Sequence, residues 1–216
     1  MLEEGDGGRR EFDHPVVAVG ASAGGVEALK SFVSEIPTDT PASFIILQHL
    51  APDHDSQLGD ILSRSSDLPV LEADENMPVS SGHIYVIQPD KYLTIVDDGL
   101  FVEPPTQRRG LRMPIDHFMR SLAETAGNRA VGVVLSGTGN DGTAGLKAIK
   151  GAGGVTLAQD PETALYDGMP RAAIEAGVVD KVGDLSALAA NIVEIANRLR
   201  DVPAESGFAR KDMQSV

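Results

Sequence analysis

The stretch Val16-Val-Ala-Val-Gly-Ala-Ser-Ala-Gly-Gly25 decides how the chain begins to fold. Its first four residues are all apolar, as in a strand that is buried on both faces of a parallel sheet. After the glycines, apolar residues recur at helical spacing until Pro37 closes the segment. These apolar residues are Val26, Leu29, Phe32, Val33 and Ile36. The sequence therefore predicts a strand, a tight turn and a helix that follow one another directly.

Ser22 lies at the centre of this turn. The glycines at 20, 24 and 25 allow backbone angles and close approaches that a Cβ would obstruct. Backbone N–H groups at a helix start have no partner within the helix and carry partial positive charge. A serine held beside them is a candidate nucleophile, with part of an oxyanion hole supplied by the backbone. Residues 20–24 also fit the G-x-S-x-G elbow pattern.

Two other interpretations of this turn stay open. The G-x-G-x-x-G fingerprint of dinucleotide-binding proteins fits nearly as well, with Ser22 in place of the middle glycine and Gly25 as the third. That replacement weakens the interpretation as a nucleotide-binding module, because the middle glycine lets a pyrophosphate approach the backbone. The turn is also compatible with a serine that has no chemical role.

Length and composition limit the classes of protein. With 216 residues, the chain suits one α/β domain with a large core. A formal charge of −14 argues against nucleic acid as a partner. Without cysteine the chain forms no disulfide, thiolate metal site or cysteine nucleophile. Neither a signal peptide nor an apolar run of membrane-spanning length is present, so we expect a cytoplasmic protein without direct membrane insertion.

The rest of the chain mostly alternates between buried strands and amphipathic helices. Charged residues 1–14 predict a flexible leader, 15–200 the folded domain and 201–216 a flexible tail. The middle of the chain, 70–102, reads as an all-β insertion with a hairpin at Asp97-Asp-Gly99. Further buried strands are expected at 44–47, 131–135 and 155–158, and a last strand at 178–182. Helices are expected at 54–64, 115–126, 143–150 and 185–199.

Three polar residues follow predicted buried strands. Ser22, His49 and Asp141 each come after one of them, and ligands collect at the carboxyl ends of strands in open α/β sheets. A serine needs a base to take its proton, and the imidazole needs an acceptor that fixes its tautomer. Asp141 could orient the histidine, cap the following helix or join a metal site. The chain order Ser, His, Asp differs from that of α/β-hydrolases, so a triad here would be convergent.

Neither a metal nor an organic cofactor is expected. A metal site at His49 and His54 lacks the H-E-x-x-H spacing and an obvious third ligand. The loop 104–114 instead carries Arg108, Arg109 and Arg112, and in a strongly acidic chain such a cluster suits a partner that bears carboxylates.

Five motifs in this order resemble the catalytic domain of the chemotaxis receptor protein-glutamate methylesterase, the CheB type. They are VVAVGASAGGVEAL (16–29), FIILQHL (44–50), GVVLSGTGNDGTAGL (132–146), TLAQD (156–160) and DGMPRAAI (167–174), and the resemblance covers about residues 15–195. It implies an α/β fold in which a doubly wound, mainly parallel sheet is flanked by helices and carries an antiparallel hairpin. It also implies Ser22 as nucleophile, His49 as base and Asp141 as the residue that orients the base.

The resemblance further implies how the site works. Backbone groups at Ala23 and Gly24, and at Gly137, Thr138 and Gly139, are expected to bind the oxyanion. The implied substrates are glutamyl methyl esters, and for many members also glutamines, on the cytoplasmic helical region of methyl-accepting chemoreceptors. We expect the arginine loop and the segment with Tyr166 and Met169 to contact this partner.

The segment before the first strand is short. Since only about 14 residues precede the first strand, we expect the N-terminal receiver domain that commonly restrains these enzymes to be absent. The motifs ASAGG (21–25) and LSGTGNDG (135–142) look more like those of methylesterase domains that are fused to methyltransferase and sensor domains. A non-catalytic receptor-binding scaffold is the other alternative, although all three catalytic residue types are present.

Overall fold

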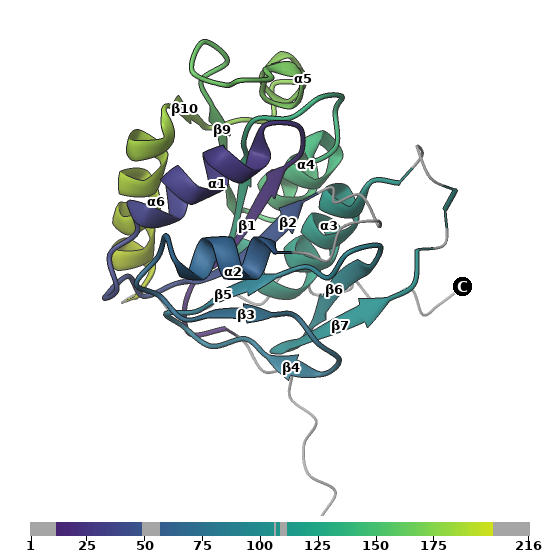
Figure 1. The fold of residues 1–216 in the computed structure, drawn as a ribbon, viewed down its shortest axis with the longest axis vertical. Coiled ribbons are helices and arrows are strands. Elements are labelled where there is room, and N and C mark those ends of the chain that lie inside the picture. Colours follow the sequence, from purple (N-terminus) through teal and green to yellow (C-terminus); the bar gives the residue numbers. More distant parts are fainter. Residues whose placement is uncertain (1–11, 49–56, 106, 109–111, 201–216) are drawn as a thin grey trace, which may run out of the picture.

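A seven-stranded parallel sheet forms the centre of the molecule (Figure 1). The computed structural model describes residues 12–48, 57–105, 107–108 and 112–200. The strand order is β10-β9-β8-β1-β2-β5-β3, and every pair is parallel. The strands are β1 (Val16–Ala21), β2 (Ser43–Gln48), β3 (Val70–Glu72), β5 (Ile84–Val86), β8 (Ala130–Val134), β9 (Val155–Gln159) and β10 (Lys181–Gly183). The mainly parallel, doubly wound fold predicted from the sequence is confirmed.

Helices cover both faces of this sheet and divide the core in two. Alternate residues of β1 enter different cores: Val17 and Val19 pack with α1, α2 and α6, while Val16 and Ala18 pack with α3, α4 and α5. This burial on both faces explains why the strand is continuously apolar. The helices are α1 (Gly25–Ser34), α2 (Leu58–Ser63), α3 (Pro114–Ala126), α4 (Thr143–Gly151), α5 (Gly168–Glu175) and α6 (Leu185–Arg200), with a 3₁₀ turn η1 (Gly127–Arg129).

The middle of the chain is all-β, as predicted, and its strands are divided between two sheets. The second sheet contains β4 (Met77–Pro78), β7 (Gly99–Glu103) and β6 (Tyr92–Val96), all antiparallel. β3 and β5 instead extend the main sheet beside β2, where Ile84 pairs with Phe44 and Val70. The fully buried Ile84–Val86 segment is too short for its pattern to show which sheet it joins.

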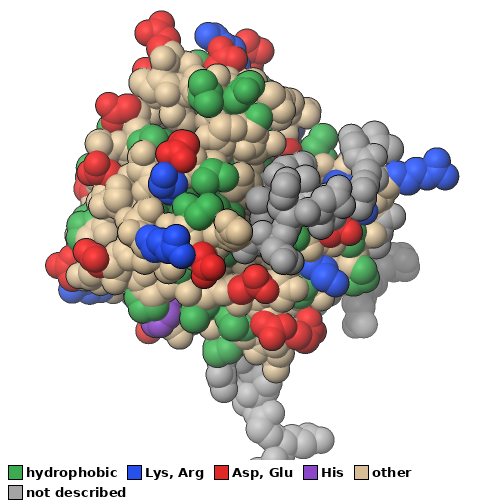
Figure 2. Space-filling view, in the orientation of Figure 1, with side chains coloured by type: hydrophobic (Ala, Val, Ile, Leu, Met, Phe, Trp, Pro, Cys, Tyr) green, Lys and Arg blue, Asp and Glu red, His purple; other side chains and the backbone are tan. Residues whose placement is uncertain are grey.

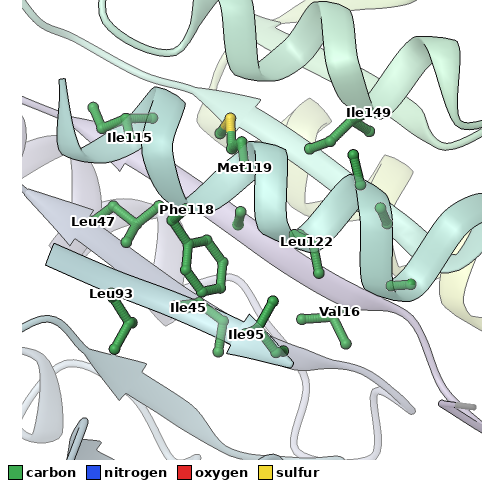
Figure 3. Packing of buried hydrophobic residues seen from close by; sticks show 14 of the residues in the cluster. Val16, Ile45, Leu47, Leu93, Ile95, Ile115, Phe118, Met119, Leu122 and Ile149 are labelled. Carbon is green, nitrogen blue, oxygen red and sulfur yellow. The ribbon is translucent and has the colours of Figure 1, made fainter. Parts of the chain in front are cut away.

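The predicted hairpin at Asp97-Asp-Gly99 is confirmed. Val96 pairs with Gly99, and Asp97 adopts a positive φ of 52° in the two-residue turn between them. Figure 3 shows Leu93 and Ile95 of β6 facing Phe118 and Leu122 of α3. The small sheet therefore holds α3 from one side while the main sheet holds it from the other.

The boundaries of several elements differ from the predictions. Phe12 and His14, placed in the flexible leader, are buried, and His14 Nε2 lies 3.2 Å from the Ser43 hydroxyl. Helix α5 begins at Gly168, so Pro170 lies in its first turn, and the last strand β10 occupies 181–183 instead of 178–182. The start of the predicted helix 54–64, most of the leader and the predicted tail 201–216 lie outside the described residues.

Candidate active site

The ends of β1, β2 and β8 bring the predicted site residues to one edge of the sheet. β1 lies between the other two strands, and the chain continues in opposite directions across the sheet from this point. Ala21 pairs with Gln48, and Gly20 pairs with Val134. The residue after β1 is Ser22, and the residue after β2 is His49, which lies outside the described residues. Such a switch point is where open α/β sheets hold their ligands.

Ser22 is held by backbone hydrogen bonds on both sides. Its N–H donates to the carbonyl oxygen of Ser136 over 3.0 Å, and its own carbonyl accepts from the N–H of Gly25 over 2.8 Å. Gly24 caps α1 in the left-handed region, with φ 68°, which a residue with a Cβ rarely adopts. None of the described residues hydrogen-bonds the Ser22 hydroxyl. The hydroxyl therefore sits on a rigid turn at a helix start.

Four backbone N–H groups beside Ser22 are available to an anion. Across the described part of the chain, the N–H groups of Ala23, Gly24, Thr138 and Gly139 have no hydrogen-bond acceptor. Gly137 differs from the prediction, because its N–H donates to the Tyr166 carbonyl over 2.9 Å. Gly137 therefore shapes the site by its small size: a Cβ there would lie 3.0 Å from the Cβ of Ser22.

The segment before α5 supports this turn from behind. The N–H of Met169 donates to the Gly137 carbonyl over 2.9 Å, and its side chain is fully buried against Gly137. Met169 thus has no exposed surface for a substrate, and we assign it a supporting role. Gly168 also packs closely against the 137–139 turn, since a Cβ at Gly168 would lie 3.2 Å from the backbone N of Gly139. The position of the 137–139 turn is therefore set by α5.

Ser136 and Gln159 connect these loops, and the sequence analysis missed both. Ser136 Oγ donates to the Ala23 carbonyl and accepts from the Tyr166 N–H, each over 3.0 Å. Gln159 Oε1 accepts from the Ser136 N–H over 2.9 Å. The signal was present in the sequence, since both polar residues follow or end buried apolar runs. A buried polar group at such a position needs hydrogen-bond partners.

Asp141 is buried, with 4% of its surface exposed, and faces the start of α3. Its Oδ2 accepts from the N–H of Ile115 over 3.1 Å, and its Oδ1 accepts from the N–H of Asp116 over 2.8 Å. Both oxygens are therefore fixed by the positive end of a helix, which favours a carboxylate. Capping and orienting a histidine were alternatives in the sequence, and here the capped helix is α3, not the helix that follows Asp141.

Asp116 is a second buried carboxylate that the sequence analysis missed. Its Oδ1 accepts from the N–H of Gly142 over 2.9 Å and from the N–H of Gly145 over 2.7 Å, at the start of α4. Burial, followed by the charge of Asp141, raises the pKa of Asp116 above its usual value, while the hydrogen bonds from Gly145 and Gly142 oppose the rise. An acidic residue in the first turn of the predicted helix, two positions after Pro114, was the available sequence signal.

The predicted substrate-binding residues are differently placed. Arg112 is half-buried, forms an ion pair with Asp90 and donates from Nε to the Gln107 carbonyl over 3.0 Å. Arg108 is exposed, and Arg109 lies outside the described residues. Tyr166, 46% exposed, lies beside Gly24 together with Leu165, 75% exposed, so an apolar rim borders the nucleophile turn.

This rim also bears on the nucleotide-binding alternative. A Cβ on Gly24 would lie 3.0 Å from carbon atoms of Leu165 and Tyr166. Side chains thus occupy the space over the turn that a pyrophosphate would need.

Within the described ranges, His, Asp and Glu side chains form no group of three that could hold a metal ion. The described helices include none with the length and apolar character of a membrane span.

Comparison with known proteins agrees with this geometry. Residues 17–192 match the family model for the CheB methylesterase. The protein-glutamate methylesterase/protein-glutamine glutaminase of Photorhabdus laumondii is 39% identical over 175 residues, which are 79% of this chain and 49% of that protein. A similarly named protein of Carboxydothermus hydrogenoformans is 39% identical over 184 residues, 82% of this chain and 54% of that protein.

A solved structure shows the same fold. The crystal structure of the Thermotoga maritima CheB methylesterase catalytic domain matches with a TM-score of 0.79 and 28% identity, over 84% of this chain and 98% of that chain. The chain spans about half the length of the curated relatives that it matches. The family match over most of the chain, the relatives and the solved domain agree with one another, and the chain belongs to the CheB methylesterase family.

Proposed function

We propose that the chain is a serine hydrolase that removes methyl groups from glutamyl methyl esters of chemoreceptors. The observation that carries this proposal is the surroundings of Ser22: a helix start, four N–H groups without an acceptor among the described residues, and the buried Asp141 at the same sheet edge. Acyl transfer needs a nucleophile, donors for an oxyanion and an oriented base in this arrangement. The names of the relatives support the same chemistry.

In this mechanism Ser22 Oγ attacks the γ-carbonyl carbon of the methylated glutamate. His49 accepts the serine proton and returns it to the departing methoxide as methanol, while Asp141 orients the imidazole and stabilises its charged form. The oxyanion would receive hydrogen bonds from the N–H groups of the Ala23–Gly24 and Thr138–Gly139 turns. Water, activated by His49, then hydrolyses the glutamyl ester on Ser22. The catalytic residues thus supply every group that the reaction requires.

Glutamine deamidation uses the same steps with ammonia as leaving group. The relatives are named protein-glutamine glutaminases as well as methylesterases, so we propose this as a second activity. The nitrogen of an amide leaves less readily than the methoxide of an ester, and its departure as ammonia depends more strongly on protonation by His49. Deamidation should therefore be the slower of the two reactions at the same site.

The proposed substrate region is the cytoplasmic helical part of methyl-accepting chemoreceptors, which places the enzyme in the cytoplasm. We assign the catalytic domain to residues 15–200, extended to Phe12 because of its burial. A folded helix that approaches the Ser22 turn from the side of Gly24 would meet the apolar rim of Leu165 and Tyr166. Figure 2 shows acidic side chains spread over the visible face with basic ones among them, and the chain carries a formal charge of −14, so contact with an acidic receptor segment needs local arginines.

Methanol release from a methylated chemoreceptor fragment tests this function. The fragment is compared with a small activated ester, and both reactions should depend on Ser22. Cleavage of the small ester alone would retain the serine hydrolase and reject the receptor as substrate. If the folded protein cleaves neither, the non-catalytic scaffold replaces the proposal.

The exposed Arg108 should matter for the receptor and not for the chemistry. Replacing Arg108 and Arg109 by alanine is expected to raise KM for the methylated receptor about 3- to 10-fold at low salt, because exposed charges contribute about 0.2–1 kcal/mol each. Arg112 is kept unchanged in this variant, because it is paired with Asp90. Steady-state kinetics on both substrates measure the effect, and the exposed Arg198 of α6, replaced by alanine, is the control. An equal change in KM for the small ester would reject a role in receptor binding.

A further inference from the structure

The starts of α3 and α4 are joined by two carboxylates that cap each other's helix. Asp141, which precedes α4, accepts from the N–H groups of Ile115 and Asp116 in α3. Asp116 accepts from the N–H groups of Gly142 and Gly145 in α4. Four hydrogen bonds of 2.7–3.1 Å therefore close a loop between the two helices, and the two carboxylates lie within it.

This arrangement fixes Asp141 from two directions. Its carboxylate is held by the first turn of α3, and its peptide is followed directly by Gly142, whose N–H binds Asp116. Gly145 leaves no room for adjustment, because a Cβ there would lie 2.5 Å from Met119 Cβ and 3.2 Å from Asp116 Cα. A displacement of Asp116 therefore acts on Asp141 in two ways. It moves the N–H group that binds Asp141 Oδ1, and it moves the Gly142 peptide that follows Asp141 in the chain.

We propose that Asp116 is a positioning residue that sets the orientation of the Asp141 carboxylate toward the base. This inference rests on the proposed serine hydrolase function. The side chain of Asp116 acts through Asp141 and through the start of α4, without touching substrate. A misplacement of a catalytic group by about 1 Å can reduce a rate about 100-fold, which is the scale of effect expected here.

Ionisation of the Asp116 carboxyl group is unfavourable for the stability of the fold. Burial and the neighbouring Asp141 charge raise the pKa of Asp116, so the folded protein binds this proton more tightly than the unfolded chain does. The ionised carboxylate therefore lowers stability at neutral pH; this penalty begins to fall as the pH drops through the raised folded-state pKa and is gone below the ordinary pKa of 3.8. The charges of Asp141 and Arg120 act on Asp116, and the cavity that Asp116 helps to line also contains His117 and Glu124 of α3 and Tyr92 of β6.

The test compares three substitutions of Asp116 on a small activated ester. Asp116→Ala removes both acceptor bonds and should lower kcat about 10- to 100-fold, with KM changed less than about twofold. Asp116→Asn keeps an oxygen for Gly142 and Gly145 and should restore kcat to within about threefold of the parent. Asp116→Glu keeps the charge but is one methylene longer, so it should lower kcat as alanine does. The exposed Glu124→Gln on the same helix is the control.

A double substitution separates positioning from a general loss of stability. If Asp116 acts through Asp141, then Asp116→Ala combined with Asp141→Asn should be no slower than Asp141→Asn alone. Additive losses, or a parent-like kcat in folded Asp116→Ala, would overturn the inference. Should the alanine variant fail to fold, Asp116→Glu and Asp116→Asn decide, and equal kcat values for these two would reject it.

The stability of Asp116→Asn gives an independent measurement. Its free energy of unfolding at pH 7 should equal or exceed that of the parent, and the difference should vanish below about pH 4, near the ordinary pKa of 3.8. A large destabilisation at pH 7 would show that the carboxylate serves the fold. If the parent protein shows no hydrolysis that depends on Ser22, by contrast, the proposed function is rejected, while the hydrogen bonds between Asp116, Asp141 and the two helix starts remain.

Discussion

Replacing Ser22 by alanine is expected to reduce methanol release by about 10⁴- to 10⁶-fold while leaving the fold intact. Removal of a nucleophilic serine from a Ser-His-Asp site has effects on this scale, and what remains comes from the oxyanion donors and binding. Stability should change little, because no described residue hydrogen-bonds the Ser22 hydroxyl. The measurement is methanol release from a methylated receptor fragment, together with a thermal unfolding curve.

Ser136 provides the matched control, since its hydroxyl lies in the adjacent loop. Ser136→Ala loses the hydrogen bonds to the Ala23 carbonyl and the Tyr166 N–H. It should therefore cost about 1–3 kcal/mol of stability and only part of the activity. The opposite pattern, in which Ser22→Ala unfolds the protein or retains its rate, would contradict the assignment of Ser22 as nucleophile.

Replacing Asp141 by asparagine is expected to lower kcat about 10³- to 10⁴-fold, because the amide no longer stabilises a charged imidazole in the required tautomer. This variant should also be less stable by about 1–3 kcal/mol. Both oxygens of Asp141 accept backbone N–H groups, so the amide nitrogen must face either Ile115 or Asp116 donor to donor. Kinetics on the small ester and denaturant unfolding measure the two effects.

Asp184→Asn is the control for this second prediction. Asp184 also accepts a backbone N–H at a helix start, that of Ala187 in α6, but it lies away from β1 and β8. Because only its Oδ1 accepts this N–H, asparagine keeps the acceptor, and neither stability nor kcat should change much. If Asp141→Asn lowers stability but leaves kcat unchanged, Asp141 is a helix cap alone, and another group must orient the base.

The sequence predicts the placement of Ser22, the proposed nucleophile, well, because local and global patterns agree there. A buried apolar strand, a glycine turn and an amphipathic helix each follow from residues 16–36 alone. That Asp141 lies at the same sheet edge follows from the parallel order of the strands. Motif order adds the family, which no single periodicity can supply.

Features that depend on distant contacts escaped the sequence. The N–H of Gly137 is bound by Tyr166, far along the chain, so its loss as an oxyanion donor is visible only in three dimensions. Asp116 binds a helix start other than its own, and local rules for helix capping examine neighbouring residues. Short buried strands such as Ile84–Val86 carry too few residues to reveal their partners.

The position of β1 in the sheet has a consequence for synthesis. Val16 pairs with Ser43 on one side and with Ala130 on the other, so the central strand needs both halves of the chain. On the ribosome, the serine emerges early, whereas Asp141, the loop that binds the Ser22 N–H and the helix that buttresses it emerge much later. A nascent chain would thus carry Ser22 before the groups that surround it in the folded domain have been synthesised. If Ser22 is the nucleophile that we propose, its reactivity should appear only after α5 has been synthesised.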